Sequence, residues 1–128
     1  EFKKWINEGV INYLGTTDDV ASYIRKSDCV VLPSYREGTP KTLLEALAIG
    51  RPIITTNVAG CKETVIDGEN GYLCEARNSN SLSNVIQKMI NLSFNDKAKM
   101  GLKSRKYAES KFAEKIVFDK YLEAINGI

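Results

Sequence analysis

Two glutamates flank a lysine in the middle of the chain. Glu37 and Glu45 are separated by seven residues, and Lys41 lies midway between them. A carboxylate accepts two hydrogen bonds at once, and an ammonium group can accompany a phosphate. Gly38 follows Glu37 directly and lets the backbone approach a ligand closely. This spacing is consistent with a site for a ligand that carries both hydroxyl groups and negative charge.

The residues around Lys41 also carry the start signals of a helix. Thr39 is a good N-cap, Pro40 suits the first helical position, and Gly50 supplies the stop signal. We therefore expect a helix over about residues 40–49. The free N–H groups of its first turn and the positive end of its dipole form a place where an anion can bind.

Lys41 is unusual for a helix that holds no ligand. The dipole disfavours a cation in the first turn by roughly a few tenths of a kcal/mol. A lysine four residues before Glu45 also forms the weaker order of ion pair. A phosphate at this helix end would account for both features. The residues leave a second interpretation open, in which Lys41, Glu37 and Glu45 are ordinary surface charges.

The composition narrows the chemistry that such a site can perform. The 128 residues include no histidine, which removes Ser-His-Asp and Cys-His nucleophiles, histidine-ligated metals and imidazole acid–base catalysis. Cys29, Cys61 and Cys74 are widely spaced and form no C-x-x-C pair, so we expect no metal site. Three unpaired thiols are typical of a reducing cytoplasm.

Length and charge are those of one ordinary globular domain. With 43% apolar and 27% charged residues the chain has the composition of a soluble protein, and no apolar run approaches the ~20 residues of a membrane-spanning helix. The net charge of +2 gives no reason to expect nucleic acid as a partner. Residues 88–128 carry nine basic and five acidic side chains. We favour a solvated helix face there over peripheral contact with an anionic membrane.

Short apolar runs alternate with helix signals along the chain. The runs that we expect to be strands cover residues 10–14, 29–32, 53–56 and 71–74, and the second is typical of a strand buried on both faces. The other expected helices begin after Asp18 or Asp19, cover 61–66, run from Asn80 or Ser81 to Ile90, cover 96–110, and carry Phe112, Ile116 and Ile125. This alternation predicts an α/β domain with a mainly parallel sheet.

The expected sheet directs attention to particular loops. Ligands of parallel sheets bind at the carboxyl ends of the strands, beside the amino ends of helices. The loops after Leu14, Leu32 and Thr56 are therefore the expected places for a site. Neither a G-x-G-x-x-G nor a Walker A loop is present, so the sequence does not support a self-contained dinucleotide or P-loop site.

The two glutamates belong to a longer pattern that resembles a known enzyme family. The E-x7-E spacing lies within S-Y-R-E-G-T-P-K-T-L-L-E-A-L-A-I-G-R-P-I-I-T-T, followed by V-A-G-C-K-E-T-V and D-G-E-N-G-Y-L. These motifs are similar, over about residues 10–125, to the C-terminal, donor-binding domain of family 4 (group 1) retaining glycosyltransferases. The resemblance implies a Rossmann-like mainly parallel sheet with flanking helices and C-terminal helices, as part of the two-domain GT-B architecture.

The resemblance implies a role for each matching residue. Glu37 would be the catalytic residue, acting on the donor sugar through position and charge more than as a proven nucleophile. Glu45 would bind the ribose hydroxyls. The donor sugar and diphosphate would lie along Glu37, Gly38, Thr39, Lys41 and Thr42, and the base would lie against Gly15, Thr16 and Thr17. Glu63 matches a frequent glutamate of the family to which we assign no role.

The implied reaction keeps the anomeric configuration and needs no bound metal or other cofactor. In the family the donor phosphate is thought to deprotonate the acceptor. The variant G-T-P-K in place of G-F-G-x resembles bacterial enzymes of capsule, O-antigen and lipid-linked glycan synthesis. We therefore expect a UDP-linked hexose or N-acetylhexosamine as donor, a glycan or lipid-linked acceptor, and a cytoplasmic location that includes the inner face of the membrane.

The match to the family also predicts the domain organisation. The C-terminal domain of the family begins with two further β-α units, whose loops supply an Arg and a Lys to the diphosphate, and an acceptor domain precedes them. Residues 1–128 would thus be a single partial donor-binding domain, inactive alone, with exposed strand edges that favour self-association.

Three functions remain open. The chain is expected to be the donor-binding part of a retaining glycosyltransferase. The alternatives are a non-catalytic module that binds nucleotide sugars and a sugar-nucleotide epimerase of the same architecture. Epimerases of that kind rely on histidines, so their absence disfavours the last alternative.

Overall fold

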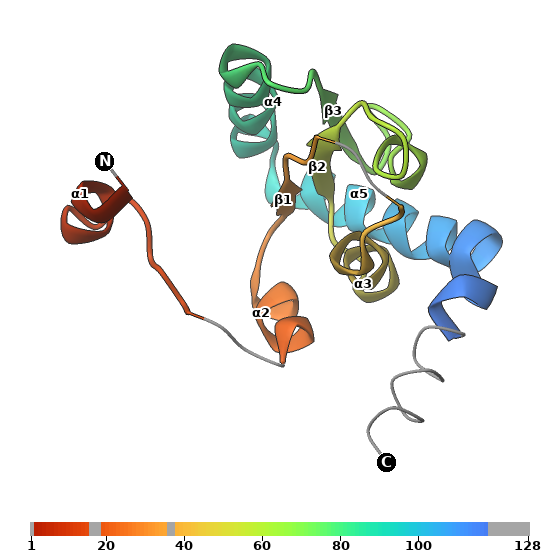
Figure 1. Ribbon diagram of the computed structural model, residues 1–128. Helices are drawn as coiled ribbons and strands as arrows, with labels where there is room; N and C mark the ends of the chain where they lie inside the picture. The colour runs from red at the N-terminus through yellow and green to blue at the C-terminus, as the bar shows by residue number, and fades with distance from the viewer. Residues whose placement is uncertain (1, 16–18, 36–37, 118–128) are drawn as a thin grey trace.

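The computed structural model describes residues 2–15, 19–35 and 38–117. In chain order the elements are α1 (Phe2–Asn7), α2 (Val20–Lys26), β1 (Val30–Leu32), α3 (Lys41–Ile49), β2 (Ile53–Thr56), the 3-10 turn η1 (Lys62–Thr64), β3 (Gly71–Cys74), α4 (Ser79–Asn91), α5 (Phe94–Tyr107) and the π-helical turn η2 (Ala108–Phe112). Figure 1 shows the strands at the centre, with helices around them.

The three strands form an open, parallel sheet in the order β1-β2-β3. Val30 pairs with Ile53, and Ile53 pairs with Gly71. A Cβ on Gly71 would lie 1.8 Å from the carbonyl oxygen of Ile53, so glycine is required at this close approach. The predicted α/β fold with a mainly parallel sheet is confirmed, and three of the four expected strands lie in it.

The central strand divides the core into two layers. Successive side chains of a strand point to opposite faces, so Ile53 and Ile54 enter different clusters. The cluster around Ile53 consists mainly of buried side chains from α2, α3 and the η1 and η2 turns: Ile24, Leu43, Leu44, Ala46, Leu47, Cys61, Val65, Ala108 and Phe112. On the other face Ile54 joins Met89 of α4 and Met100 of α5. Helices on both faces are what a parallel sheet requires.

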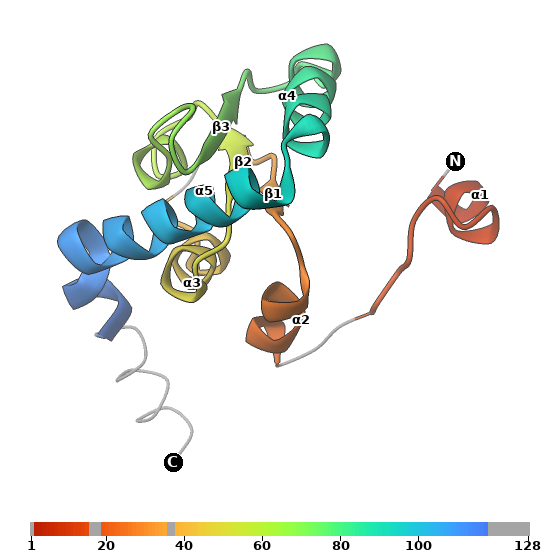
Figure 2. The ribbon, with the colours of Figure 1, turned by 180° about the vertical axis from the view of Figure 1, so that it is seen from behind.

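Helix α5 lies along the ends at which the strands begin. A Cβ on Gly101 of α5 would lie 2.3 Å from the carbonyl oxygen of Gly50, which precedes β2. Ser104, also on α5, exchanges hydrogen bonds of 3.4 Å with Asn70, which precedes β3. Figure 2 shows α5 crossing the molecule beside the strands. The amino edge of the sheet is therefore covered, and the carboxyl edge is left to the loops.

The prediction of a strand over residues 10–14 is wrong. These residues have no regular secondary structure, and Val10, Tyr13 and Leu14 are 69%, 62% and 54% exposed. Figure 1 shows this segment apart from the sheet. A strand exists only through hydrogen bonds to a neighbour, and β1 pairs within the described residues only with β2.

Burial of the strands also differs from the prediction. Strand β2 is buried throughout, but in β1 the side chain of Val31 is 42% exposed. The reason is that β1 is an edge strand of the described sheet, and α4 packs on β3 at its other edge. The run at 29–32 therefore forms a strand that is not buried on both faces.

Three helix predictions require correction at their ends. The expected separate helices after residue 96 form one continuous run as far as residue 117, because α5 continues through η2 into helical residues 113–117, and Ile125 lies outside the described residues. The expected helix over 61–66 is the single 3-10 turn η1. Asn78, and neither Asn80 nor Ser81, caps α4 by accepting a 3.0 Å bond from the Ser81 amide. The expected Asp19 cap of α2 is confirmed by a 3.2 Å bond from the Ser22 amide.

The described residues contain no helix that is both long and apolar enough to cross a membrane. All three cysteines are free, with Cys61 and Cys74 buried and Cys29 half-buried.

Candidate functional site

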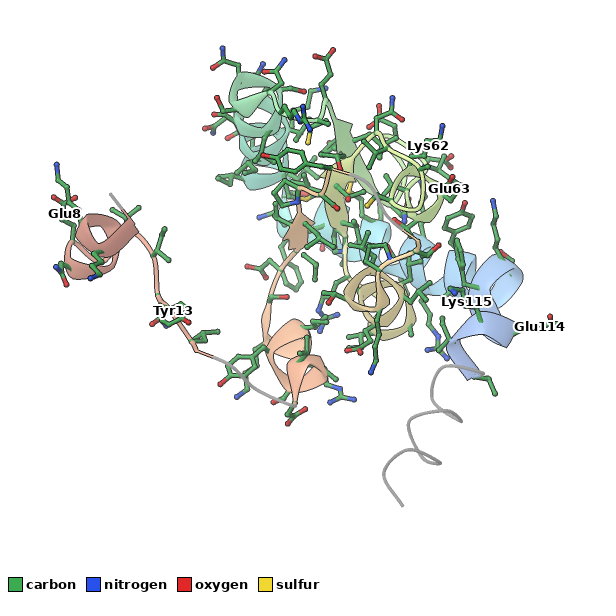
Figure 3. The ribbon with its side chains drawn as sticks, viewed as in Figure 1. Glu8, Tyr13, Lys62, Glu63, Glu114 and Lys115 are labelled. Carbon is green, nitrogen blue, oxygen red and sulfur yellow. The ribbon has the colours of Figure 1, made fainter. Side chains whose placement is uncertain are left out.

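The carboxyl ends of the three parallel strands meet at one edge, and a loop follows each of them. The loop after β1 leads into α3, the loop after β2 leads into η1, and the loop after β3 leads into α4. Figure 3 shows Lys62 and Glu63 projecting from η1, with Tyr13 far from both. The polar side chains and amides of this edge are the candidates for binding a ligand.

Two threonines of β2 fix the loop after β1. The hydroxyl of Thr55 donates a 2.8 Å hydrogen bond to the carbonyl of Leu32, and the hydroxyl of Thr56 donates to the carbonyl of Ser34. Both threonines are almost fully buried, and each finds in the neighbouring backbone the acceptor that a buried hydroxyl needs. The loop that carries the predicted site therefore leaves the sheet along a fixed path.

The N-cap residue of helix α3 provides no side-chain cap. Pro40, and not the expected Thr39, occupies the N-cap, because its ψ of 136° is still extended. The carbonyl of Pro40 accepts bonds of 3.1 and 3.3 Å from the amides of Leu43 and Leu44. Within the described residues, the amides of Gly38, Thr39 and Thr42 donate to no acceptor. The start of α3 therefore presents unused donors at the carboxyl edge of the sheet. Gly50, with a φ of 90°, closes the helix as predicted.

The structure brings five of the predicted site residues together at the junction between the loop after β1 and the start of α3. Gly38 and Lys41 are exposed, and Thr39, Thr42 and Glu45 are half-buried. They come from one loop and the first two turns of α3. Because the dipole of a nine-residue helix favours negative charge at this end, the junction is suited to an anion.

The remaining predicted residues are not part of this junction. Glu37, Thr16 and Thr17 lie outside the described residues. Gly15 is described, with a φ of 77°, and belongs to the exposed segment that lies apart from the sheet. No group of three or more potential metal-ligating side chains occurs among the residues that the structure describes.

Glu63, which had no assigned role, organises the loop after β2. Its carboxylate accepts a 2.8 Å bond from the amide of Gly60, and its backbone carbonyl accepts a 2.8 Å bond from the hydroxyl of Tyr107. The side chain therefore holds the turn that enters η1. Tyr107 connects that turn to the end of α5, so the loop is anchored from both sides.

A hollow of about 540 Å³ opens where β3 ends and α4 begins. Its lining includes Pro33 and Tyr35 from the loop after β1 and Cys74, Glu75, Arg77 and Asn78 from the end of β3. The guanidinium carbon of Arg77 lies 5.1 Å from the centre of the Tyr35 ring. Arg77 has a φ of 57°, which is uncommon for a residue with a side chain. Sequence reasoning missed this hollow, since no motif signals it.

The family is decided by a match over most of the chain. The sequence pattern of the family described as glycosyl transferases group 1 matches residues 3–107. The chain belongs to this family. The resemblance seen in the two glutamates and the glycine-rich segments is thus confirmed.

Among curated group 1 glycosyltransferases and their relatives, two bacterial sequences illustrate the match. An N,N'-diacetylbacillosaminyl-diphospho-undecaprenol α-1,3-N-acetylgalactosaminyltransferase of Campylobacter jejuni is 29% identical over 126 residues, which are 98% of this chain and 33% of that protein. A capsular polysaccharide biosynthesis glycosyltransferase of Staphylococcus aureus is 33% identical over 102 residues, or 80% of this chain and 27% of that protein. The chain spans about a third or less of the length of these relatives.

Solved structures agree with the GT-B assignment of this group 1 domain. Sucrose-phosphate synthase from Thermosynechococcus elongatus superposes with a TM-score of 0.78 at 26% identity, covering 99% of this chain and 34% of that one. The HepE protein of Anabaena, solved in complex with UDP, gives a TM-score of 0.80 at 22% identity, covering 99% and 36%. At 22% identity, the similarity to HepE shows a shared fold.

Proposed function

We propose that residues 1–128 are the donor-binding part of a retaining glycosyltransferase, as a single partial Rossmann-like domain. The parent enzyme would transfer a hexose or N-acetylhexosamine from a UDP-linked sugar to a glycan or a lipid-linked acceptor. The observation that carries this proposal is the uncapped start of α3 at the carboxyl edge of the sheet, in a chain that belongs to the group 1 family.

The proposed donor lies along the loop and the first turn of α3. Its diphosphate accepts hydrogen bonds from the amides of Gly38, Thr39 and Thr42, and Lys41 offers a cation beside it. Glu45, one turn further along α3, accepts hydrogen bonds from the two ribose hydroxyls. Glu37 contacts the sugar hydroxyls. Gly15, Thr16 and Thr17 hold the base, which requires the segment of Gly15 to move towards α3 from its place apart from the sheet.

The proposed reaction is a displacement at the anomeric carbon that retains its configuration. The bond from C1 to the β-phosphate oxygen breaks, a bond from C1 to the acceptor oxygen forms, and UDP leaves with the acceptor proton on its phosphate. Amides already aimed at the diphosphate stabilise the negative charge that grows on the leaving group. Glu37 stabilises positive charge that develops at the sugar. The proposed reaction uses no metal or other cofactor.

The nature of the acceptor is inferred from relatives. The Campylobacter jejuni relative is named for a diphospho-undecaprenol acceptor and the Staphylococcus aureus relative for capsular polysaccharide synthesis. These names support a role in polysaccharide biosynthesis on lipid carriers, and we propose the cytoplasm, at the inner face of the membrane, as its location. Basic α5 lies at the amino edge of the sheet, so contact of this helix with a membrane would leave the donor site facing away. Salt-sensitive binding to anionic liposomes tests that contact.

The donor site can be tested with the chain itself. In an amide NMR titration with UDP, and then with UDP-N-acetylglucosamine, we expect saturable shifts at Gly38, Thr39 and Thr42. The expected affinity is on the order of millimolar, or about −4 kcal/mol. Saturable shifts confined to other residues would contradict the proposed position of the donor.

A substitution of Glu37 tests whether this residue acts in catalysis. In the intact enzyme, Glu37→Ala should lower kcat by on the order of a hundredfold, because it removes charge that acts on the transition state. UDP binding should change little. Unchanged turnover would refute the role of Glu37, whereas an intact wild-type protein that binds UDP without any turnover would favour a non-catalytic binding module.

A further inference from the structure

The hollow at the end of β3 is distinct from the start of α3. It borders Leu82 of α4, whose side chain belongs to the core cluster on the face of the sheet opposite α3. Tyr35 connects the two places, because it lines the hollow and belongs to the loop that leads through residues 36 and 37 to Gly38. A ligand in the hollow would therefore lie beside the donor loop without occupying the donor site.

The polar groups of the hollow are positioned by bonds among themselves. The amide group of Asn78 donates a 2.9 Å bond to the carboxylate of Glu75, and its oxygen caps α4. The backbone amide of Glu75 donates a 2.9 Å bond to the hydroxyl of Ser81. The exposed carboxylate and amide therefore orient each other, which favours selective binding.

Arg77 is held on an aromatic ring and keeps its hydrogen-bond donors. Its guanidinium lies over Tyr35, and in the described part of the chain it forms neither a salt bridge nor a hydrogen bond. Guanidinium has five N–H donors in a planar fork, which can reach two neighbouring oxygens at once. Tyr35 is 63% exposed, so the ring retains surface on which an apolar face of a ligand can pack.

The balance of charges indicates the kind of ligand. Arg77 supplies one positive charge and Glu75 one negative charge, so the lining of the hollow has no net charge that would favour an anion such as phosphate. A neutral molecule with many hydroxyls satisfies donors and acceptors together and can place its C–H surface against Tyr35. A volume of about 540 Å³ lies within the usual range of ligand pockets, roughly 300–1,000 Å³.

We propose that this hollow binds a neutral hexose unit of the acceptor glycan. The inference rests on the proposed function, since it places a second sugar beside the loop that would hold the donor. Arg77 and Glu75 would bind vicinal hydroxyls, and Tyr35 would pack against the ring of the sugar. The end of β3 would thereby contribute to acceptor specificity.

The test is an amide NMR titration of the chain with methyl α-D-glucopyranoside, repeated with UDP and with inorganic phosphate. We expect the sugar to shift Tyr35, Glu75, Arg77 and Asn78 with a dissociation constant on the order of 10 mM. UDP should shift Gly38, Thr39 and Thr42 and leave the hollow unaffected. Addition of both should produce both sets of shifts.

Arg77→Gly provides the sharpest variant. Glycine adopts a φ of 57° without strain, so the fold should be kept while the guanidinium is lost. We expect at least a fivefold weaker binding of the sugar and unchanged binding of UDP. The matched control is Lys88→Ala, because Lys88 forms a similar contact, 5.4 Å from the centre of the Tyr72 ring, and does not line the hollow. Tyr35→Phe should keep sugar binding, and Tyr35→Ala should lose it.

Several results would overturn the inference. If UDP binds as expected and the sugar shifts nothing, the acceptor subsite is refuted and the donor site stands. The subsite is also refuted if the sugar shifts only Gly38–Thr42, or if phosphate shifts Arg77 as strongly as the sugar does. Absence of shifts with both UDP and sugar refutes the subsite and also removes the support for the proposed donor site.

Discussion

The two edges of the sheet are built differently. At the amino edge, α5 packs so closely that Gly101 has no room for a side chain, and buried Asn70 and Ser104 satisfy each other. At the carboxyl edge, a Cβ on Gly38 would have no non-neighbouring atom of the described residues within 4 Å, and the N-cap residue of α3 provides no side-chain cap. The tightest helix contact and a bonded pair of buried polar side chains thus lie at one edge, and unused backbone donors lie at the other.

This difference implies that the amino edge contributes mainly to stability and the carboxyl edge mainly to binding. Buried polar groups at the amino edge are fully bonded, so changes there leave voids, clashes or unpaired groups. The carboxyl edge keeps donors and space that a ligand can use. We therefore expect substitutions at the amino edge to lower the free energy of unfolding, and substitutions at the carboxyl edge to change binding.

The largest expected effect is that of a single methyl group at the closest helix contact. Gly101→Ala should lower the free energy of unfolding by about 3 kcal/mol, because the new Cβ meets the carbonyl oxygen of Gly50. In an open helix interior the same change stabilises by about 1 kcal/mol. Chemical denaturation followed by circular dichroism measures the difference.

The matched change at the other edge is Gly38→Ala. It should alter the free energy of unfolding by less than about 0.5 kcal/mol, because the added methyl group meets nothing in the described structure. Stabilisation by Gly101→Ala would show that α5 does not lie where the structure places it.

Asn70→Ala should have the next largest effect. The side chain of Asn70 donates a 3.0 Å bond to the carbonyl of Thr64 and accepts a 2.8 Å bond from the amide of Ile66. Its removal leaves partly or fully buried backbone groups unpaired, which should cost about 2–3 kcal/mol. Asn57→Ala, an exposed asparagine at the carboxyl edge, is the control and should be nearly neutral. Equal effects of the two changes would contradict the contrast between the edges.

Glu45→Ala should weaken binding and leave stability nearly unchanged, the reverse of what we expect for Asn70→Ala. If Glu45 binds the ribose, its removal should weaken UDP binding about tenfold, equivalent to about 1.4 kcal/mol. Because its side chain is only half-buried, stability should change by less than about 0.5 kcal/mol. Glu69→Ala, a glutamate before β3, is the control for a lost surface charge. Isothermal titration with UDP measures both variants, and equal affinities would refute the ribose contact.

The parts of the fold that the sequence predicts best are those with local signals. The apolar runs that became β1, β2 and β3 end at proline, glycine or polar residues, and α3 ends at Gly50 as its left-handed conformation requires. The run at 10–14 has the same local character but pairs with no strand in the described part of the chain, and a pairing partner is not a local property. The exposure of Val31 has the same kind of cause, since it depends on where α4 packs.

In the candidate site, too, the features with local signals could be predicted and the others could not. The position of Gly38, Lys41 and Thr42 at the carboxyl edge follows from the rule for parallel sheets and from the helix start signals. The exact cap does not, because the residue types predict Thr39 as the cap and Pro40 as the first helical residue, whereas the extended backbone of Pro40 starts the helix one residue later. The contact of Arg77 with Tyr35 joins residues 42 positions apart in the chain and needs a positive φ that arginine rarely adopts. No spacing rule could have indicated it.

The smallest expected effect concerns the thiol of Cys29, which lies just before β1 at the amino edge. Burial raises the pKa of this thiol from 9.0 to about 11. Between these two values the unfolded chain loses the thiol proton and the folded chain keeps it, so stability should fall as the pH rises from 9 to 11. The total loss over this range should be below about 1 kcal/mol, since the side chain is only half-buried.

The measurement is the difference in free energy of unfolding between the wild type and Cys29→Ala, taken from pH 7 to pH 11. Subtraction removes the titration of lysines and tyrosines, which the two proteins share. The difference should be constant below pH 9 and should decline above it. A difference that stays constant to pH 11 would mean that water reaches Cys29, and the amino edge would then be less tightly closed than the contacts of α5 imply.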